Sequence, residues 1–185
     1  NKNKRYINRL LLTAIAVVTL HACANRGQGP EGGPKDETPP SVVKSMPSNK
    51  ALNIKKGKVE ITFDENINVL KASENVIISP PQREMPDIKS YGKTVTVQLN
   101  DTLLPNTTYS INFGDAIVDN NESNPLKNYF FAFSTGSEID TMQIAGTLVD
   151  AKNLNPVQGV TVGIHSDLSD TVFMKRPFLR ISRTN

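Results

Sequence analysis

The stretch TYSINFGD, residues 108–115, alternates large apolar side chains with small or polar ones. Tyr109, Ile111 and Phe113 occupy every second position, so in an extended chain they point to one face. A period of two residues is typical of a β-strand with one buried and one solvated face. The stretch therefore predicts a half-buried strand and argues against a helix.

Three further runs repeat this pattern between residues 58 and 134. Their apolar positions are Val59, Ile61 and Phe63, then Val95, Val97 and Leu99, then Tyr129, Phe131 and Phe133. The run NVIISPP adds a short strand, and stretches rich in Asn, Gly and Pro separate the strands. Short alternating strands divided by turns are typical of an all-β fold, an antiparallel β-sandwich.

The residues LLPNTTY, 103–109, lead into the strand of Tyr109. Their pattern Leu-x-Pro-x-Thr-x-Tyr resembles the tyrosine corner of immunoglobulin-like and fibronectin type III domains. The resemblance implies that the Tyr109 ring packs in the core while its hydroxyl bonds to nearby backbone. With the closing run FAFSTG, the order of elements resembles the bacterial Ig-like module of S-layer proteins and Gram-negative lipoproteins. We therefore expect an Ig-like domain over residues 41–136.

A second β-pattern follows a short polar joint. One run places Ile144, Gly146 and Leu148 on one face, and the next places Val160, Val162 and Ile164 on one face. The order of these runs resembles the start of a carboxypeptidase regulatory-like, transthyretin-like sandwich. We expect residues 139–185 to form part of such a domain, with its remaining strands beyond residue 185. The alternative is that these strands extend the first sandwich.

The start of the chain has the features of a secretory signal. Basic residues precede an apolar run over 10–20, which is shorter than the roughly 20 residues of a membrane-spanning helix. The run ends in Leu20-His21-Ala22-Cys23, which resembles the bacterial lipobox, although His21 is an unusual occupant. The resemblance implies a signal helix over 1–22, cleavage between Ala22 and Cys23, and acylation of Cys23 with fatty acids such as palmitate. The alternative is a buried cysteine at the end of a core helix.

Residues 23–40 contain the modified cysteine and a flexible spacer. Residues 24–40 include four Gly and four Pro and have no large apolar side chain, so they cannot form a core. Ala24 stands where an aspartate would resemble the signal for retention at the inner membrane. The resemblance therefore favours the outer membrane, with the periplasmic or the cell-surface side left open.

The net charge depends on whether this leader is removed. The whole chain has 21 Lys and Arg against 18 Asp and Glu, a net charge of +3. Residues 1–22 hold four of the bases and none of the acids, so cleavage leaves 17 against 18, or −1. A nucleic-acid partner is therefore not expected. The late cluster Lys175, Arg176, Arg180 and Arg183 is interpreted as a solvated strand face.

One loop carries oxygen side chains that suit calcium. The loop GDAIVDNNESN offers Asp115, Asp119, Asn121 and Glu122, and Ca²⁺ prefers oxygen ligands. Asp64 and Glu65 could join them if the loops meet. The alternative is a polar turn between strands, because Asn and Asp tolerate left-handed backbone geometry. No other cofactor is expected.

A three-residue pattern points to modification. Thr102, Thr141 and Thr171 each follow an aspartate and precede an aliphatic residue. This pattern resembles the O-glycosylation acceptor that some Gram-negative lineages use in exported proteins. No nucleophile–base pair, metal motif or phosphate loop is apparent in the sequence, so we expect no enzymatic activity.

These features together predict a non-catalytic, lipid-anchored cell-envelope protein. Its Ig-like module would act as a spacer or as a docking surface for other envelope proteins, because sandwich edges offer unpaired backbone groups. The alternatives are a surface glycan-binding accessory lipoprotein and a stalk for a domain beyond residue 185. The absence of Trp and the 6% aromatic content do not favour the glycan alternative.

Overall fold

The computed structural model describes residues 3, 4, 6, 33 and 35–184 of the chain. The chain divides into two units, residues 1–35 and residues 36–185. Most of the predicted signal segment, together with Ala22 and Cys23, lies outside the described residues, so cleavage and lipidation stay predictions.

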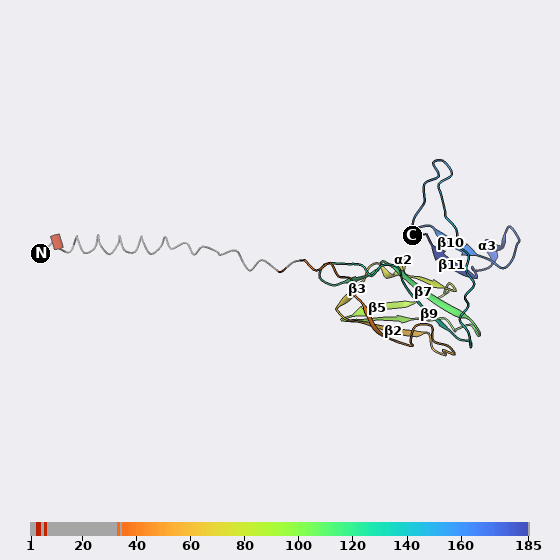
Figure 1. The fold of residues 1–185 in the computed structure, drawn as a ribbon, viewed down its shortest axis with the longest axis horizontal. Coiled ribbons are helices and arrows are strands. Elements are labelled where there is room, and N and C mark those ends of the chain that lie inside the picture. Colours follow the sequence, from red (N-terminus) through yellow and green to blue (C-terminus); the bar gives the residue numbers. More distant parts are fainter. Residues whose placement is uncertain (1–2, 5, 7–32, 34, 185) are drawn as a thin grey trace. The chain divides into compact units, whose positions relative to one another are not determined.

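The second unit begins with an antiparallel β-sandwich (Figure 1). One sheet has the spatial order β1 (Val42–Met46), β2 (Lys58–Phe63), β6 (Thr94–Gln98) and β5 (Asp87–Tyr91). The other has the order β4 (Ile77–Ser79), β7 (Thr108–Gly114) and β9 (Tyr129–Ser134). A two-stranded sheet joins β3 (Ile67–Val69) to β8 (Ile117–Asp119). The predicted all-β, Ig-like sandwich is confirmed.

The predicted alternation builds the core of the sandwich. In β7 every second side chain is buried, and the exposed fractions of Tyr109, Ile111 and Phe113 are 2%, 0% and 0%. β7 pairs with β9 so that Tyr109 lies opposite Phe133 and Ile111 opposite Phe131. Since directly opposed side chains of an antiparallel pair contact each other, one register places two sequence-distant apolar sets side by side.

The tyrosine corner is also confirmed. The Tyr109 ring stacks on Phe133 with 5.3 Å between ring centroids and 8° between ring planes. The Tyr109 hydroxyl accepts a hydrogen bond from the backbone N–H of Leu104, with an N–O distance of 2.7 Å. The buried ring thus keeps its polar end satisfied, as a buried hydroxyl requires.

Four of the strands did not show in the sequence pattern. β3 and β8 have only three residues each, and all three residues of β8 are buried, so that strand has no alternation to detect. β1 and β5 lie at the two ends of their sheet and bury few side chains. Edge strands with little burial carry a weak hydrophobic signal.

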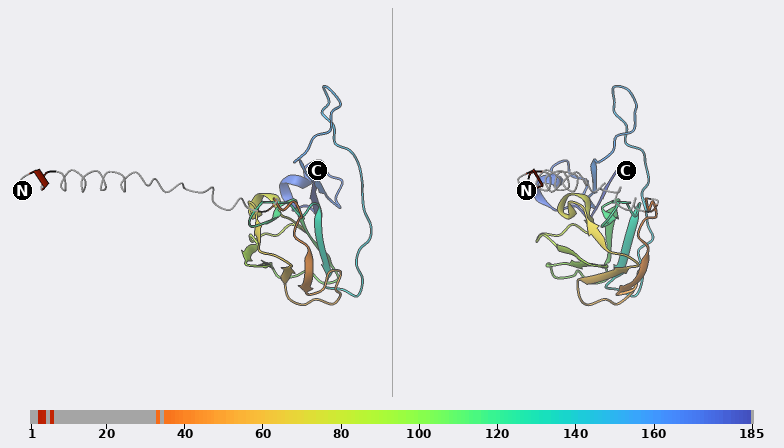
Figure 2. Two further views of the ribbon diagram at one scale, coloured as in Figure 1. Left: turned by 60° about the vertical axis from the view of Figure 1, so that its left-hand side comes forward. Right: turned by 90° about the vertical axis from the view of Figure 1, so that its left-hand side faces the viewer.

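The region after the sandwich contains β10 (Thr161–Ile164), α3 (Val172–Lys175) and β11 (Arg180–Arg183). β10 and β11 pair antiparallel as a two-stranded sheet, with Val162 opposite Ser182. Both views of Figure 2 show the segment before β10 standing away from the strands. The described residues after 136 form this one two-stranded sheet, and the predicted partial transthyretin-like domain stays a prediction.

The predicted strand over Ile144, Gly146 and Leu148 is wrong. No strand is assigned there, and the exposed fraction of Ile144 is 82%. A strand needs hydrogen-bonding partners along its length, and among the described residues this segment has one such backbone bond, from Val157 N to Leu148 O. Alternation alone therefore did not form a strand here.

Candidate functional site

The loop predicted to bind calcium is organised around Asp119. Its side chain is 1% exposed, and its two carboxylate oxygens accept the backbone N–H groups of residues 121, 122, 123 and 124 at 2.6–3.0 Å. Burial raises the pKa of Asp119, but the four N–H groups outweigh burial and hold the pKa below its ordinary value. Asp119 thus closes the loop by bonding to its backbone.

The other predicted calcium ligands are not gathered on Asp119. The Asp115 carboxylate accepts the backbone N–H of Asn128 at 3.1 Å, and Asn121 is exposed. Within the described part of the chain, no group of three or more His, Cys, Asp or Glu side chains could hold a metal ion. These contacts favour the polar turn over a calcium site.

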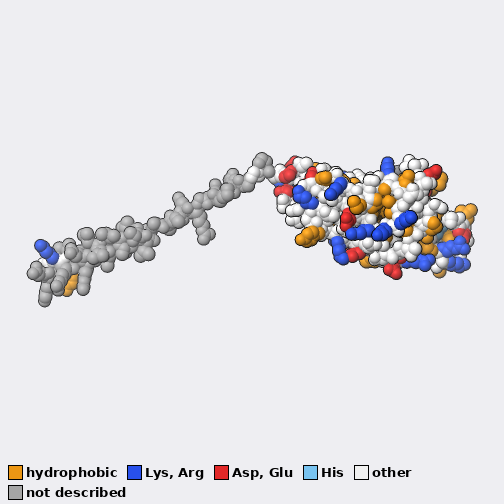
Figure 3. All heavy atoms as spheres, turned by 90° about the horizontal axis from the view of Figure 1, so that it is seen from below, with side chains coloured by type: hydrophobic (Ala, Val, Ile, Leu, Met, Phe, Trp, Pro, Cys, Tyr) orange, Lys and Arg blue, Asp and Glu red, His pale blue; other side chains and the backbone are white. Residues whose placement is uncertain are grey.

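Acidic side chains nevertheless gather where the second unit begins (Figure 3). The two predicted loops do meet, because Asn120 N–H donates to Asn66 O at 3.0 Å. Burial raises the pKa of Glu65, and the neighbouring carboxylates, Asp119 foremost, raise it further. The folded domain therefore holds Glu65 in a negative environment that disfavours its ionised form.

The end of the predicted spacer is attached to this same region. The Asn124 side-chain amide donates to the Asp36 carbonyl at 2.9 Å. The N–H and hydroxyl of Ser41 both donate to the Asp64 carboxylate, at 2.8 and 2.5 Å. Pro40 is buried. Residues 36–40, which we predicted to be flexible spacer, thus contact the sandwich.

The three predicted O-glycosylation acceptors are all exposed. Thr102 follows β6, Thr141 lies in the segment after the sandwich, and Thr171 directly precedes α3. The aspartate before Thr102, Asp101, accepts the backbone N–H groups of residues 83 and 84, and these bonds lower its pKa. A modifying enzyme would therefore find these threonines accessible, and their modification stays a prediction.

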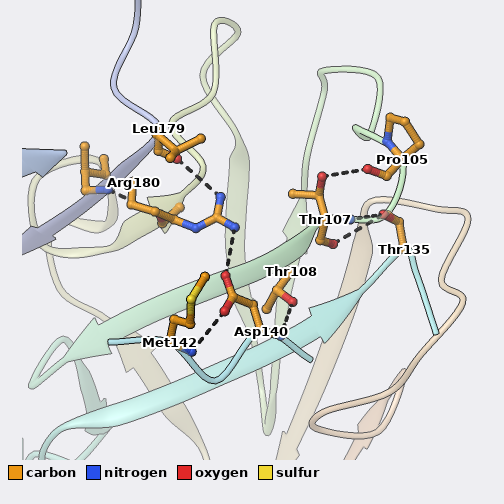
Figure 4. A network of polar contacts seen from close by, with 10 residues as sticks. Pro105, Thr107, Thr108, Thr135, Asp140, Met142, Leu179 and Arg180 are labelled. Atoms are coloured by element: carbon orange, nitrogen blue, oxygen red, sulfur yellow. Dashed lines mark hydrogen bonds and ion pairs between the residues drawn. The ribbon is translucent and has the colours of Figure 1, made fainter. Parts of the chain in front are cut away.

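Asp140 joins the sandwich to the region that follows (Figure 4). Its backbone N–H donates to the Thr108 hydroxyl at 2.8 Å, and its carboxylate accepts the Met142 N–H at 2.9 Å. The same carboxylate lies 3.8 Å from the Arg180 guanidinium on β11. One residue thus contacts β7, the start of the exposed segment and the last strand.

The late basic cluster is not simply solvated. Arg180 pairs with Asp140, and Arg183 Nη1 donates to the Glu74 carbonyl at 2.5 Å. The predicted solvated strand face is therefore wrong for these two residues, although Lys175 is exposed. Lys and Arg side chains share the face in Figure 3 with Asp and Glu, so this face has no continuous patch of one sign.

Two hollows lie beside β4 and the proline turn that follows it, and no pattern in the sequence indicated them. The first, of about 640 Å³, has largely apolar walls that include Val76, Ile78 and Ile88, and Ile181 of β11 lines it as well. The second, of about 820 Å³, continues toward α3 and includes Tyr109, His165 and Phe178. Ile181 lies a hundred residues from β4 in sequence, so no local pattern connects them.

The single histidine in the second unit, His165, packs against an aromatic ring. His165 follows β10, and its ring lies 4.6 Å from the ring of Phe178 between centroids. Its side chain is partly buried. Its neighbours among the described residues do not include a metal-binding group of acids and histidines.

Comparison with known families identifies the sandwich. The bacterial Ig-like domain family matches residues 36–135, more than half of the chain. The protein therefore belongs to the bacterial Ig-like domain family. The match begins at Asp36, the residue at which the second compact unit begins. No curated protein matched the chain.

Solved structures give looser similarities. An L,D-transpeptidase from Mycobacterium smegmatis matches with 16% identity and a TM-score of 0.38, over 54% of this chain and 41% of that one. The N-terminal part of the bacterial S-layer protein SbsC matches with 19% identity and a TM-score of 0.34, over 70% of this chain and 27% of that one. A longer S-layer structure, rSbsC(31-844), matches with 17% identity and a TM-score of 0.34, over 79% of this chain and 18% of that one. The chain spans less than half of each.

No helix among the described residues is long and apolar enough to cross a membrane.

Proposed function

We propose that this chain is a non-catalytic, lipid-anchored protein of the bacterial cell envelope whose Ig-like domain acts as a spacer or docking module. The family match supports the module, and the resemblance of residues 20–23 to a lipobox supports the anchor. Cys23 would carry the acyl chains, and residues 24–35 would form the flexible tether. Several acyl chains on one residue bind a bilayer far more tightly than a single chain does.

The observation that carries the proposal is the attachment of residues 36–41 to the sandwich. Asn124 bonds to the Asp36 backbone, and Asp64 bonds to Ser41, at the end of the domain where the tether arrives. A short Gly- and Pro-rich tether between Cys23 and this fixed start would hold the sandwich close to the membrane surface.

Detergent phase partitioning of the protein expressed in a Gram-negative host tests the anchor. The wild type should enter the detergent phase, and its mature N-terminal peptide should begin at an acylated Cys23. The variant Cys23→Ala should stay in the aqueous phase and keep residues 1–22. An aqueous wild type, or one that keeps its first residues, would overturn the proposal.

Membrane fractionation tests the localisation. We expect the wild type in the outer-membrane fraction and the variant Ala24→Asp in the inner-membrane fraction. Protease added to whole cells then distinguishes the periplasmic side of the outer membrane from the cell-surface side. A protein that faces the cell exterior is cleaved, and one that faces the periplasm is protected. Equal inner-membrane recovery of both proteins would contradict an outer-membrane location.

O-glycosylation at Thr102, Thr141 and Thr171 is part of the same proposal. All three side chains are exposed, as acceptors must be. Intact-mass analysis of the protein from a host that glycosylates exported proteins should show added mass. The variant Thr141→Ala should lose one increment, while a matched control at another exposed threonine, Thr38→Ala, should lose none.

A further inference from the structure

β4 is an edge strand whose second side is only partly covered. In its three-stranded sheet, β4 pairs with β7 and lies at the end of the order. Along it runs the hollow of about 640 Å³ with apolar walls at Val76, Ile78 and Ile88. We call this hollow the β4 groove. Edge strands with an apolar groove are typical places for an added strand to bind.

The chain itself shows what the β4 groove accepts. β11 runs beside β4, and Ile181 lines the groove while its N–H donates to the Ser79 hydroxyl at 3.3 Å. Two residues further on, the Arg183 guanidinium donates to the Glu74 carbonyl. One residue before Ile181, Arg180 faces the Asp140 carboxylate. The occupant is an extended strand with an aliphatic side chain between two arginines.

The hold of β11 on the groove is weak. β11 is hydrogen-bonded in a sheet only to β10, and among the described residues no backbone–backbone hydrogen bond joins it to β4. Its Arg180–Asp140 pair is partly exposed, and such pairs contribute little. The preceding segment, which includes Met142 and Ile144 at 88% and 82% exposure, adds little packing. Regions with few buried contacts open locally at low cost in free energy.

We propose that the β4 groove is a docking site for an extended strand of a protein partner, and that β11 is its resident, displaceable occupant. The partner strand carries an aliphatic residue that enters the groove and flanking basic residues that bind the Glu74 carbonyl and neighbouring acceptors. The inference rests on the proposed docking role of the module, and it names the surface and the partner chemistry.

The full chain with Ile181→Asp and a labelled peptide test this proposal. The probe is PFLRISRT, the sequence of residues 177–184, whose binding is followed by fluorescence anisotropy. A charge placed against the apolar walls of the groove should release β11. The variant should then bind the peptide at least about tenfold more tightly than the wild type, whose own strand competes at high effective concentration. The matched variant Ile144→Asp, on an exposed aliphatic outside the groove, should behave like the wild type.

Hydrogen exchange of the β4 amides provides a second, independent measurement of whether the groove is occupied. The Ile181→Asp variant should exchange the amides of residues 77–79 faster than the wild type, and added peptide should restore protection there. A peptide with Asp in place of its isoleucine should neither bind nor protect. Failure of the wild-type peptide to bind the variant, or equal binding to both proteins, would overturn the inference. Detergent partitioning would be unaffected by either result, so the two proposals fail separately.

Discussion

Val97 in the sandwich and Val162 in the C-terminal β10–β11 sheet both lie within short antiparallel strands, but their surroundings differ. Val97 is 0% exposed, whereas Val162 is 46% exposed. The strand of Val97 buries every second side chain, whereas no residue of β10 is buried. The difference shows that an alternating strand becomes stable through the layer that covers it.

The two regions also differ in how much apolar side chain they bury. The sandwich buries four phenylalanine rings almost completely, at Phe63, Phe113, Phe131 and Phe133. Among the described residues after 136, Val172 is the one buried apolar side chain. Burial of apolar surface is the main favourable term in folding, so the sandwich contributes most of the free energy of unfolding.

The largest expected effect comes from removing one of those rings. Phe113→Ala should lower the free energy of unfolding by about 3–5 kcal/mol, because it leaves a cavity beside Tyr129, whose ring centroid lies 5.6 Å away. Val162→Ala should change it by less than about 0.5 kcal/mol, as is usual for exposed positions. Urea unfolding followed by circular dichroism measures both.

Equal losses of unfolding free energy in these two variants would contradict the comparison. They would mean that the β10–β11 sheet and the sandwich unfold as one cooperative unit. Both variants should therefore also be compared for the denaturant slope, which reports the surface exposed on unfolding. An unchanged slope in both variants keeps the two free energies comparable.

The next effect concerns the buried carboxylate that closes the calcium-candidate loop. Asp119→Asn removes an ionised acceptor of backbone N–H groups and should lower the melting temperature at pH 7. Because the folded-state pKa of Asp119 is depressed, its stabilising contribution is present above about pH 4 and is lost as pH falls toward the folded-state pKa. The variant should therefore lose less stability on acidification than the wild type, as thermal melts across acidic pH will show.

Glu65→Gln supplies a control of opposite sign at the same end of the sandwich. Its pKa is raised, so the ionised form destabilises the fold at pH 7, and this penalty disappears as pH falls below its folded-state pKa. The variant should melt at a higher temperature than the wild type at pH 7.

Thermal melts of the wild type with and without calcium test whether the Asp119 loop binds this ion. The calcium concentration should be about 1 mM, the affinity range of extracellular calcium modules. A calcium-dependent rise would favour the metal site over the turn.

Much of the sandwich could be predicted from sequence because its information is local. The alternation of apolar and polar residues predicts β2, β6, β7 and β9. The spacing of Pro105 and Tyr109 predicts the tyrosine corner. The same rule failed at Ile144, since alternation describes only what a strand would bury and says nothing of whether a covering surface exists.

The groove at β4 was beyond sequence reasoning for a related reason. It depends on Ser79 meeting the backbone of Ile181 and on Glu74 meeting Arg183, contacts between residues about a hundred positions apart. Arg183 looked like one more solvated base because nothing near it in sequence is its partner. The Asp119 loop was half predicted, since its oxygen-rich composition suits both metal binding and the backbone bonds that it makes.

A smaller effect is expected from the tyrosine corner. Tyr109→Phe keeps the stacked ring and removes the hydroxyl that accepts the Leu104 N–H. The free energy of unfolding should fall by about 1 kcal/mol, the net contribution of a typical hydrogen bond. Tyr129→Phe is the matched control, because it removes a hydroxyl from the rim of the same core. A loss at Tyr109 no larger than the loss at Tyr129 would show that the corner is only a packing feature.

The smallest effect on stability should come from the joint between the two regions. Asp140→Ala removes the partly exposed ion pair with Arg180 and the bond to the Met142 N–H, and should change the unfolding free energy of the sandwich by less than about 0.5 kcal/mol. It should nevertheless speed proteolytic cleavage between residues 137 and 160, because that exposed segment loses its attachment. Limited proteolysis with mass spectrometry measures the rate, with Asp167→Ala, which faces Arg176 at 3.9 Å, as control. An unchanged cleavage rate would mean that Asp140 does not attach the β10–β11 sheet to the sandwich, and that the two are joined through the β4 groove instead.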